Sequence, residues 1–503
     1  MHSVAVIYLV LLLFLIYRTG SFGMIRDDRI SATQFTWLFL LKALAVPVFS
    51  LVYAKFYGGV EGLDAGVFYK DAKAVHAFAL SDPGAYLKLM FGLLDDSEGS
   101  YVYRHCLVHT QNWDNGKIRD FFYNDNRIVI RLHSLIHFIA FNSYFVHALL
   151  SCFLSFIGIV YLYKSFKEFF PGKELWLLFV FCFFPTLWFY TGAVSKEGIA
   201  LFVLGCSVYS LKKLIYRQAA FRDVLWLALL LATSCFLKPY LLCSAALCFA
   251  LFFFLHRFQV RYRILYFMGA LIFCGIAVNG LSILVRHKSL SHAAFARQRI
   301  FADAARGGIF LIDSVEFIRL DYDSTLVKKA GAGYYTIKKD IPYIYWEHSH
   351  QEDTLFCTAN KDTTRRYQMV YQLPESGSNF DLSVYSGGKV RLLASCLYYS
   401  LFYPFFINAK GLLQMVASLE NLLILLSLLI VLTGLVRNRK DNFPVLVFMV
   451  FALGLCILVG LTTPNSGAIF RYRSPAVIFI LAAALYYWVP LKARARAFSQ
   501  EGR

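Results

Sequence analysis

Charged residues are scarce in this sequence. Lys, Arg, Asp and Glu make up 16% of its 503 residues, against about 25% in an average soluble domain. Acidic residues are the scarcer sign, with 31 Asp and Glu against 50 Lys and Arg. Hydrophobic residues reach 58%, and the mean hydropathy is +0.56. This balance excludes an ordinary soluble domain and indicates an integral membrane protein.

Motifs for a structural metal site are also missing. The eleven cysteines include no CxxC pair, and no zinc-ligand spacing occurs. Most of them lie within apolar runs, where cysteine behaves as a small hydrophobic residue. Cys106 and Cys357 lie outside such runs, and a disulfide between them stays open. Internal repeats, low-complexity tracts and lipidation motifs are likewise absent.

Apolar runs of membrane-spanning length recur along the chain. A spanning helix needs about 20 apolar residues. The first run lacks the basic start and the small-residue cleavage pattern of a signal peptide, so we expect it to remain as a span. The sequence therefore predicts an all-α polytopic membrane protein with about eleven transmembrane helices, at 3–17, 33–53, 144–163, 175–193, 197–214, 223–238, 240–255, 264–284, 414–435, 443–462 and 474–490.

The net charge of +19 comes mostly from short loops between these runs. If the spans alternate, most of the basic loops fall on one face, and the positive-inside rule makes that face cytoplasmic. The charge therefore reflects topology, and no nucleic acid partner is expected. The loop residues are Arg18, Arg26, Arg29, Lys164, Lys167, Lys173, Lys212, Lys213, Arg217, Arg222, Arg257, Arg261, Arg263, Arg437, Arg439, Lys440, Lys492, Arg494 and Arg496.

The outer face then holds two long segments. The stretch "NRIVIRLHSLIHFIAF" places Arg127, Arg131 and Ser134 on one side of a helix and apolar residues on the other, which predicts a helix in the membrane interface. The stretch 390–410 is interpreted as a second interfacial helix. Residues 290–388 have a soluble composition, with β-branched and aromatic residues in "YYTIKKDIPYIYW", and predict a small mixed α/β extracytoplasmic insertion.

These observations predict five parts along the chain. They are an N-terminal transmembrane hairpin (1–57), a first extracytoplasmic loop with interfacial helices (58–143), a central transmembrane bundle (144–284), an extracytoplasmic soluble insertion with an interfacial helix (285–410), and C-terminal transmembrane helices with a basic cytoplasmic tail (411–503).

Charged residues at the outer rim are the functional candidates, because charges this close to lipid are costly unless they are paired or face a wet cavity. They come from four separate loops. "YGGVEGLDAGVFYKDA" contains the two aspartates among the candidates, "FPTLWFYTGAVSKEGIALF" breaks at Ser195, and the others lie in "FLKPY" and "FRYRSP". The candidates are Asp64, Asp71, Lys196, Glu197, Lys238, Arg471 and Arg473.

At these residues the chain resembles the GT-C superfamily of integral membrane glycosyltransferases. The resemblance rests on an acid in the first large outer loop, interfacial helices, a second acid at an outer helix start after "FP", and "RYRSP" opening a late span. It is closest to the protein-mannosyltransferase-like and bacterial branches that use polyprenyl-phosphate-linked sugars. The likeness covers the architecture over most of the chain.

The resemblance implies roles for individual residues. Asp64 corresponds to the catalytic acid of the first loop, with Asp71 as the less favoured occupant. Glu197 corresponds to the acid of the second loop, and Arg471 and Arg473 to the site of the carrier phosphate. This chain has "DA" where the family has two adjacent acids, and one carboxylate is a weak site for a hard cation. A divalent metal therefore stays open, and the lipid-linked sugar is the co-substrate.

The chemistry of sugar transfer fits these residue types. A carboxylate takes the proton of the acceptor hydroxyl, and cationic donors stabilise the leaving phosphate. We therefore expect Asp64 to be the base, and Arg471 and Arg473, with Lys196 and Lys238, to bind the phosphate. Glu197 would orient a lysine or bind a sugar hydroxyl.

Each candidate also has a structural interpretation. Asp64 could cap a helix, and Asp71 could belong to a solvated face. Lys196 and Glu197 could form an ordinary turn between helices, and Lys238 could extend its side chain to the interface.

The expected function is transfer of a sugar to a glycan, lipid or protein acceptor in cell-envelope assembly.

The resemblance implies a bacterial inner membrane, an extracytoplasmic active face and a cytoplasmic C-terminus. Two alternatives to the transferase remain. One is a polysaccharide polymerase or ligase acting on lipid-linked oligosaccharides, and the other is a transporter or flippase of lipid-linked sugars.

Overall fold

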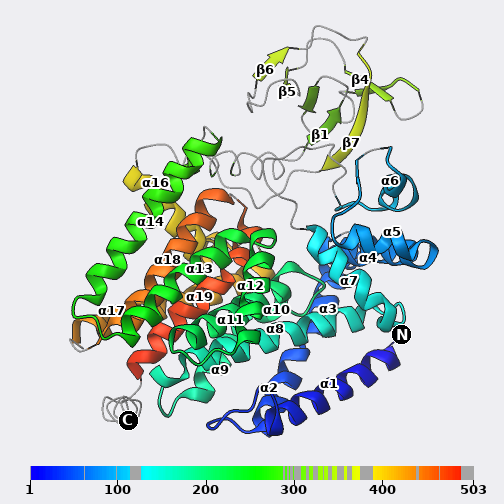
Figure 1. Cartoon of the computed structure of the whole chain (residues 1–503). Coiled ribbons are helices and arrows are strands. Elements are labelled where there is room, and N and C mark those ends of the chain that lie inside the picture. Colours follow the sequence, from blue (N-terminus) through cyan, green and yellow to red (C-terminus); the bar gives the residue numbers. More distant parts are fainter. Residues whose placement is uncertain are drawn as a thin grey trace. The chain divides into compact units, whose positions relative to one another are not determined.

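The chain folds into two units (Figure 1). The first comprises Met1–Leu271, Leu423–Leu453 and Ser474–Arg503, and the second Ile272–Leu422 and Gly454–Arg473. The computed structural model describes residues 2–61, 63–97, 99–113, 126–286, 289–291, 294, 298, 308–312, 316–320, 327–331, 334–337, 342–347, 356–359, 365–373, 389–409, 411–437, 441–463 and 465–488.

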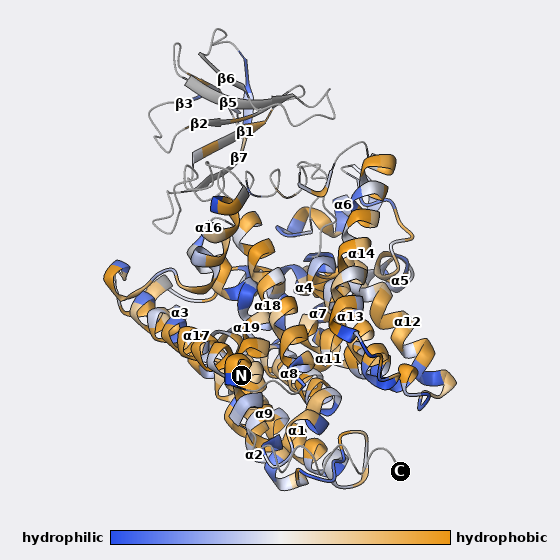
Figure 2. Cartoon of the chain, turned by 90° about the vertical axis from the view of Figure 1, so that its left-hand side faces the viewer, coloured by the Kyte–Doolittle hydropathy of each residue, from blue (hydrophilic) through white to orange (hydrophobic). Residues whose placement is uncertain are grey.

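Helices dominate the described residues. Figure 2 shows the long helices coloured mostly as hydrophobic, as expected for segments in contact with lipid. In chain order the helices are α1 (His2–Phe22), α2 (Ala32–Ala43), α3 (Ala45–Tyr57), α4 (Asp64–Ser81), α5 (Pro83–Met90), α6 (Tyr101–His105), η1 (Leu107–His109), α7 (Asn126–Ala140), α8 (Tyr144–Phe166), η2 (Lys167–Phe169), α9 (Glu174–Phe183), α10 (Pro185–Tyr190), α11 (Lys196–Ile215), α12 (Phe221–Phe236), α13 (Pro239–Arg257), α14 (Arg263–Arg286), α16 (Lys389–Leu401), η5 (Phe406–Asn408), α17 (Leu412–Arg437), α18 (Phe443–Thr462) and α19 (Ser466–Trp488).

Nine helical stretches in the described part of the chain are long and apolar enough to cross a membrane. They are Ser3–Phe22, Ala32–Phe56, Tyr144–Phe169, Lys196–Ile215, Pro239–Arg257, Arg263–Val285, Leu412–Arg437, Phe443–Thr462 and Gly467–Trp488. The prediction of a multi-pass helical membrane protein is confirmed. The count of eleven is not, because the predicted spans 175–193 and 223–238 fall short of the required length.

Proline explains both short segments. Pro185 is the first residue of α10, and the predicted span 175–193 divides there into α9 and α10. Proline has no N–H to donate into the preceding turn and disfavours helical geometry in the residue before it. At the end of α12 the same effect acts before Pro239, where Lys238 takes a left-handed conformation with φ of 49°.

Close helix packing surrounds α11, which lies beside α8, α12 and α13 (Figure 1). Glycine permits the approach to α8. A Cβ built on Gly205 would lie 1.8 Å from the carbonyl oxygen of Gly158, and one built on Gly158 would lie 2.3 Å from that of Leu201. Small residues at such crossings let helix backbones pack directly in membranes. The position of α11 therefore depends on having no side chain at these two glycines.

Ion pairs fix the direction of α12 relative to α11. Lys213 near the end of α11 pairs with Asp223 near the start of α12, with 2.6 Å between nitrogen and oxygen. At the other end, Glu197 of α11 pairs with Lys238, just after α12, also at 2.6 Å. The two helices are therefore antiparallel, and α12 follows α11 over the 16 residues of α12, about 24 Å.

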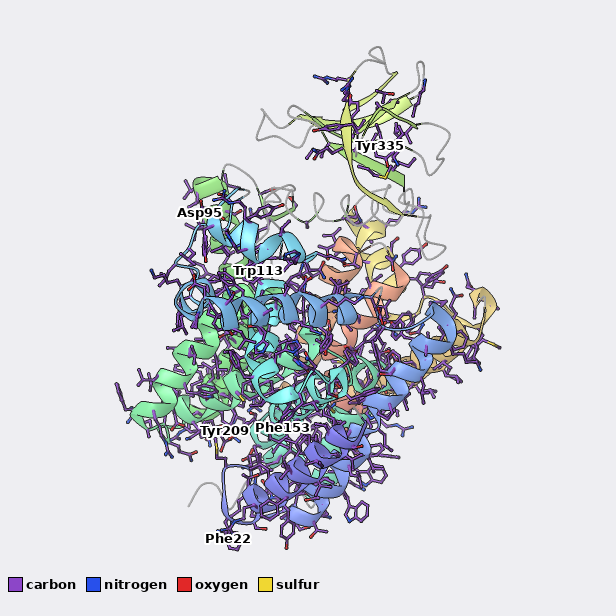
Figure 3. The ribbon with its side chains drawn as sticks, turned by 90° about the vertical axis from the view of Figure 1, so that its right-hand side faces the viewer. Phe22, Asp95, Trp113, Phe153, Tyr209 and Tyr335 are labelled. Carbon is purple, nitrogen blue, oxygen red and sulfur yellow. The ribbon has the colours of Figure 1, made fainter. Side chains whose placement is uncertain are left out.

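Helix α7 confirms the helix predicted for "NRIVIRLHSLIHFIAF". It packs beside α4, and Leu135, Phe138 and Ile139 on its other side are exposed. Its arginines cover the buried ring of Trp113 (labelled in Figure 3), with the guanidinium carbons of Arg127 and Arg131 at 5.6 and 5.2 Å from the ring centroid. An exposed apolar side is what a helix in the membrane interface requires.

The second unit contains a seven-stranded antiparallel sheet with the order β3-β4-β7-β1-β2-β5-β6. Alternate residues of neighbouring strands form its small core, which includes Ile309 and Leu311 of β1 and Ile318 of β2. The predicted β-containing insertion is therefore present. The strands are β1 (Gly308–Ile312), β2 (Glu316–Leu320), β3 (Val327–Lys329), β4 (Tyr334–Ile337), β5 (Pro342–Glu347), β6 (Phe356–Ala359) and β7 (Tyr367–Leu373).

Candidate functional site

Asp64 is the first residue of α4 and is exposed. Leu63 occupies the N-cap position with an extended backbone and makes no side-chain cap, so Asp64 is not the capping residue. A carboxylate in the first turn is still favoured by the helix dipole. Gly66 lets the preceding loop fold against the helix, since a Cβ there would lie 2.2 Å from the Val60 carbonyl oxygen.

Asp71 lies two turns further along α4 and is 1% exposed. Its carboxylate accepts hydrogen bonds from the backbone N–H groups of Gln111 (2.9 Å) and Asn112 (2.7 Å). Burial raises the pKa of Asp71, although the two backbone donors favour the charged form. Asp71 therefore anchors the loop after η1 and does not belong to a solvated face.

Lys196, the first residue of α11, reaches α4. Its ammonium nitrogen lies 5.8 Å from the centroid of the Phe68 ring, a cation–π contact. Phe68 follows Asp64 by four residues and precedes Asp71 by three, so the three share one face of α4. Lys196 is thereby placed beside the face that begins with Asp64.

Glu197 and Lys238 form a buried ion pair at the starts of α11 and α13. Their nitrogen and oxygen atoms are 2.6 Å apart, and their side chains are 1% and 3% exposed. Lys238 is the N-cap residue of α13 and is followed by Pro239 at the first helical position. Its ammonium is turned into the bundle, so it does not extend to the interface. A buried pair of this kind depends on both partners, because either charge alone would be expensive to bury.

The structure adds Lys42, which the sequence interpretation had left unmarked. It lies in α2, is completely buried, and donates a hydrogen bond of 2.7 Å to the hydroxyl of Thr191, in the turn before α11. Gly192, which follows Thr191, leaves room for the backbone of Ala45, since a Cβ on Gly192 would lie 2.5 Å from the Ala45 carbonyl carbon. A lone lysine in the predicted span 33–53 was the available signal, since ionisable residues inside membranes are rarely incidental.

Four histidines form a second group that the sequence interpretation missed, where α4, α7 and α8 meet. His133 and His147 share a hydrogen bond of 2.9 Å between their Nδ1 atoms. The rings of His137 and His147 lie 4.2 Å apart, and those of His76 and His137 stack at 5.5 Å. The spacing of His133 and His137 by four residues, one helical turn, was the available signal.

Burial favours the neutral form of the two histidines of α7. It lowers the pKa of His133 to about 3 and that of His137 to about 4. Among the described residues, no three or more His, Cys, Asp or Glu are arranged to hold a metal ion. Cys106, the residue that follows α6, is a buried free thiol.

Arg471 and Arg473 belong to the second unit. Arg473 is completely buried. It donates to the Ser400 carbonyl at 2.6 Å, to Glu420 at 3.1 Å and to the Asn421 side-chain oxygen at 2.6 Å. It thereby ties α19 to α16 and α17. Arg471 lies two residues earlier and is partly buried. Glu420 and Asn421 lie inside an apolar run, and their partner could not be read from the sequence.

The structure thus collects part of the predicted set. Lys196, Glu197 and Lys238 gather at one end of α11, beside the face of α4 headed by Asp64. Asp71 and Arg473 are engaged by other groups of the protein. The gathered residues combine an exposed carboxylate at the start of α4 with an ammonium beside Phe68 of the same helix, residue types that suit proton removal and the binding of a developing anion. Comparisons of the chain with protein-family models, curated proteins and solved structures found no match.

Proposed function

We propose that this protein is a membrane glycosyltransferase that moves a sugar from a polyprenyl-phosphate donor to a glycan, lipid or protein acceptor. One observation carries the proposal. The exposed Asp64 begins a face of α4 whose Phe68 ring lies 5.8 Å from the ammonium of Lys196, beside the buried pair of Glu197 and Lys238. A general base and a phosphate-binding cation are thereby supplied from neighbouring elements.

The proposed reaction uses these groups in one displacement. The acceptor oxygen attacks the anomeric carbon while the bond from that carbon to the phosphate oxygen breaks. Asp64 takes the proton of the acceptor hydroxyl, and polyprenyl phosphate leaves with the bonding electrons. Lys196 stabilises the negative charge on that phosphate, while Glu197 and Lys238 hold the start of α11 in place.

Of the two arginines, Arg471 is the better candidate for a phosphate contact, because Arg473 is completely buried and Arg471 is only partly buried. The proposal assumes no distance or contact between Arg471 and Lys196. A divalent metal at Asp64 rests on the family resemblance alone and has no role in the proposed reaction.

The proposed topology keeps eleven crossings. The pair of α9 and α10 is taken to cross as one broken segment, and α12 as a short one. Glu174 at the start of α9 pairs with Arg29 at 2.8 Å, which puts that end with the basic loops. Alternation then gives an extracytoplasmic Asp64 and a cytoplasmic C-terminus in a bacterial inner membrane, with a role in cell-envelope glycan assembly.

The first experiment is sugar transfer by purified protein in detergent, with a panel of radiolabelled polyprenyl-phosphate sugars. We expect Asp64→Asn to reduce turnover by at least about 100-fold, the usual contribution of a general base, without changing the melting temperature. Glu61→Gln is the matched control, because Glu61 is an exposed carboxylate of the same loop that pairs only at the surface with Lys70, at 3.0 Å.

Three outcomes would redirect the assignment. Full turnover in Asp64→Asn removes Asp64 as the base. Retained activity in that variant with loss in Arg471→Gln favours a polymerase or ligase of lipid-linked oligosaccharides. If no donor is turned over but labelled lipid-linked sugar crosses reconstituted vesicles, the protein is a flippase.

A further inference from the structure

A large polar cavity lies at the opposite end of α11 from Glu197. Its volume is about 810 Å³, within the usual range of ligand sites. It is formed by the loop between α1 and α2 and by the ends of α8, α11 and α13. The lining residues are Arg26, Asp27, Asp28, Lys164, Lys167, Glu168, Tyr209, Lys212, Lys213, Tyr216, Gln218 and Arg257.

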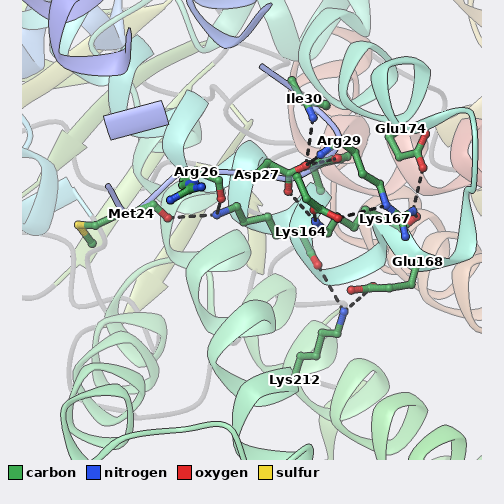
Figure 4. A network of polar contacts seen from close by, with 12 residues as sticks. Met24, Arg26, Asp27, Arg29, Ile30, Lys164, Lys167, Glu168, Glu174 and Lys212 are labelled. Atoms are coloured by element: carbon green, nitrogen blue, oxygen red, sulfur yellow. Dashed lines mark hydrogen bonds and ion pairs between the residues drawn. The ribbon is translucent and has the colours of Figure 1, made fainter. Parts of the chain in front are cut away.

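Positive charge exceeds negative charge in this lining, with six Lys and Arg against three Asp and Glu. Three of the cations have carboxylate partners. Lys167 pairs with Asp27 and Asp28, Lys212 with Glu168 (Figure 4), and Lys213 with Asp223 outside the lining. Those pairs leave the remaining three cations as the source of the net positive charge.

The remaining cations are Arg26, Lys164 and Arg257. The ammonium of Lys164 donates to the backbone carbonyls of Met24 (3.1 Å) and Arg26 (2.8 Å), as Figure 4 shows. Within the described residues neither guanidinium has an ion-pair partner, and that of Arg257 lies 6.0 Å from the Tyr216 ring. Both arginines are exposed to the cavity's solvent.

Neutral hydrogen-bond donors in the lining also suit an anion. The tyrosines and the amide of Gln218 add hydrogen-bond donors to the lining. Guanidinium groups bind phosphate oxygens through two parallel N–H bonds, which makes phosphate the anion that this donor set fits best. The C-terminal ends of α8, α11 and α13 also meet here, and their partial negative charge favours basic residues. That charge explains why cations gather here but not why they enclose a cavity.

We propose that this cavity is a second ligand site, which binds a phosphate group through Arg26 and Arg257. The phosphate belongs either to the headgroup of an anionic lipid or to a soluble phosphorylated compound. This site is separate from the sugar-transfer site and does not depend on its assignment.

The test measures binding to the purified full-length protein in zwitterionic detergent by calorimetry, with two probes. One probe is inorganic pyrophosphate, and the other is a short-chain phosphatidic acid. We expect at least one probe to bind, and the variant Arg26→Gln/Arg257→Gln to bind it at least about tenfold more weakly. Arg261→Gln is the matched control, because Arg261 lies in the loop between α13 and α14, close in sequence to Arg257 but outside the lining.

Each result has a defined meaning. Binding of pyrophosphate assigns a soluble ligand, and binding of phosphatidic acid alone assigns a lipid headgroup. Equal affinity of the double variant and the wild type, or no binding of either probe, overturns the proposal. The melting temperature of the double variant should match that of the Arg261→Gln control, since neither arginine has an ion-pair partner in the described part of the chain.

Discussion

Glu197 shows how far a single residue can be interpreted from sequence. The break at Ser195, Lys196 and Glu197 was visible, and so was the need for a partner. The adjacent Lys196 is not the observed ion-pair partner, because consecutive helical residues point in different directions. The partner is Lys238, at 2.6 Å and 41 positions away. Only the pairing of α11 with α12 and α13 brings them together.

This ion pair leads to the first stability prediction. We expect Glu197→Gln and Lys238→Met each to destabilise the protein by about 3–5 kcal/mol, because each leaves one buried charge without its counterion. The combined variant should be more stable than either single one, since both charges are gone. Thermal unfolding of the purified proteins in one detergent measures these differences.

The same variants separate structure from function. If Glu197 and Lys238 only hold the start of α11, the combined variant recovers sugar transfer together with stability. If Glu197 also contacts the sugar, stability returns and transfer does not. Single variants that unfold like the wild type would contradict the buried pair itself.

At the scale of elements, hydropathy located the helices but not their contacts. The apolar runs predicted all nine stretches of spanning length, because lipid requires a long apolar surface whatever the fold. The turn at Lys238 and Pro239 was predicted, because the spans 223–238 and 240–255 divide there. The division at Pro185 was not predicted, because the apolar runs on both sides hid it. The contact of α8 with α11 was not predictable, since a glycine in a helix does not reveal which neighbour approaches it.

That contact supports the second stability prediction. Gly205→Ala should destabilise the protein by about 1–3 kcal/mol, the usual cost of overpacking, because the new Cβ would lie 1.8 Å from the carbonyl oxygen of Gly158. Gly269→Ala in α14 is the matched control. Its Cβ meets nothing within 4 Å, and alanine favours a helix over glycine by about 0.5–1 kcal/mol.

Melting temperatures of the two glycine variants, compared with the wild type, decide the matter. A stable Gly205→Ala protein would mean that α8 and α11 can separate without cost. A Gly269→Ala protein as unstable as Gly205→Ala would mean that the effect is not specific to the crossing.

For the whole molecule, the gathering of basic loops connects sequence with structure. Loops that lie far apart in the chain line one cavity. They include Arg26, Lys164, Lys212 and Arg257. Alternating spans place these loops on the same face of the membrane. The sequence could group these residues by the positive-inside rule. It could not show that they enclose a cavity, because the tilt and packing of the helices determine that. The group around Arg473 was equally hidden, since its acceptors lie on separate helices.

The number of crossings gives the last prediction. If α9 with α10 crosses, the loops at Gly172 and Ala219 lie on the same side, because α11 returns the chain. If α12 crosses, the loops at Ala219 and Gln259 also lie on the same side, because α13 returns it. Reporters inserted after each of these residues, one active only in the cytoplasm and one only outside it, test both statements.

We expect all three insertions to report the cytoplasm, and an insertion after Gly331 in the sheet unit to report the outside. Opposite sides for Gly172 and Ala219 would remove the crossing of α9 with α10, and opposite sides for Ala219 and Gln259 would remove that of α12. Either result would break the alternation that puts Lys196, Glu197 and Lys238 on the same side as Asp64. The groups of the proposed site would then lie on opposite faces of the membrane, so topology decides whether the transferase assignment can stand.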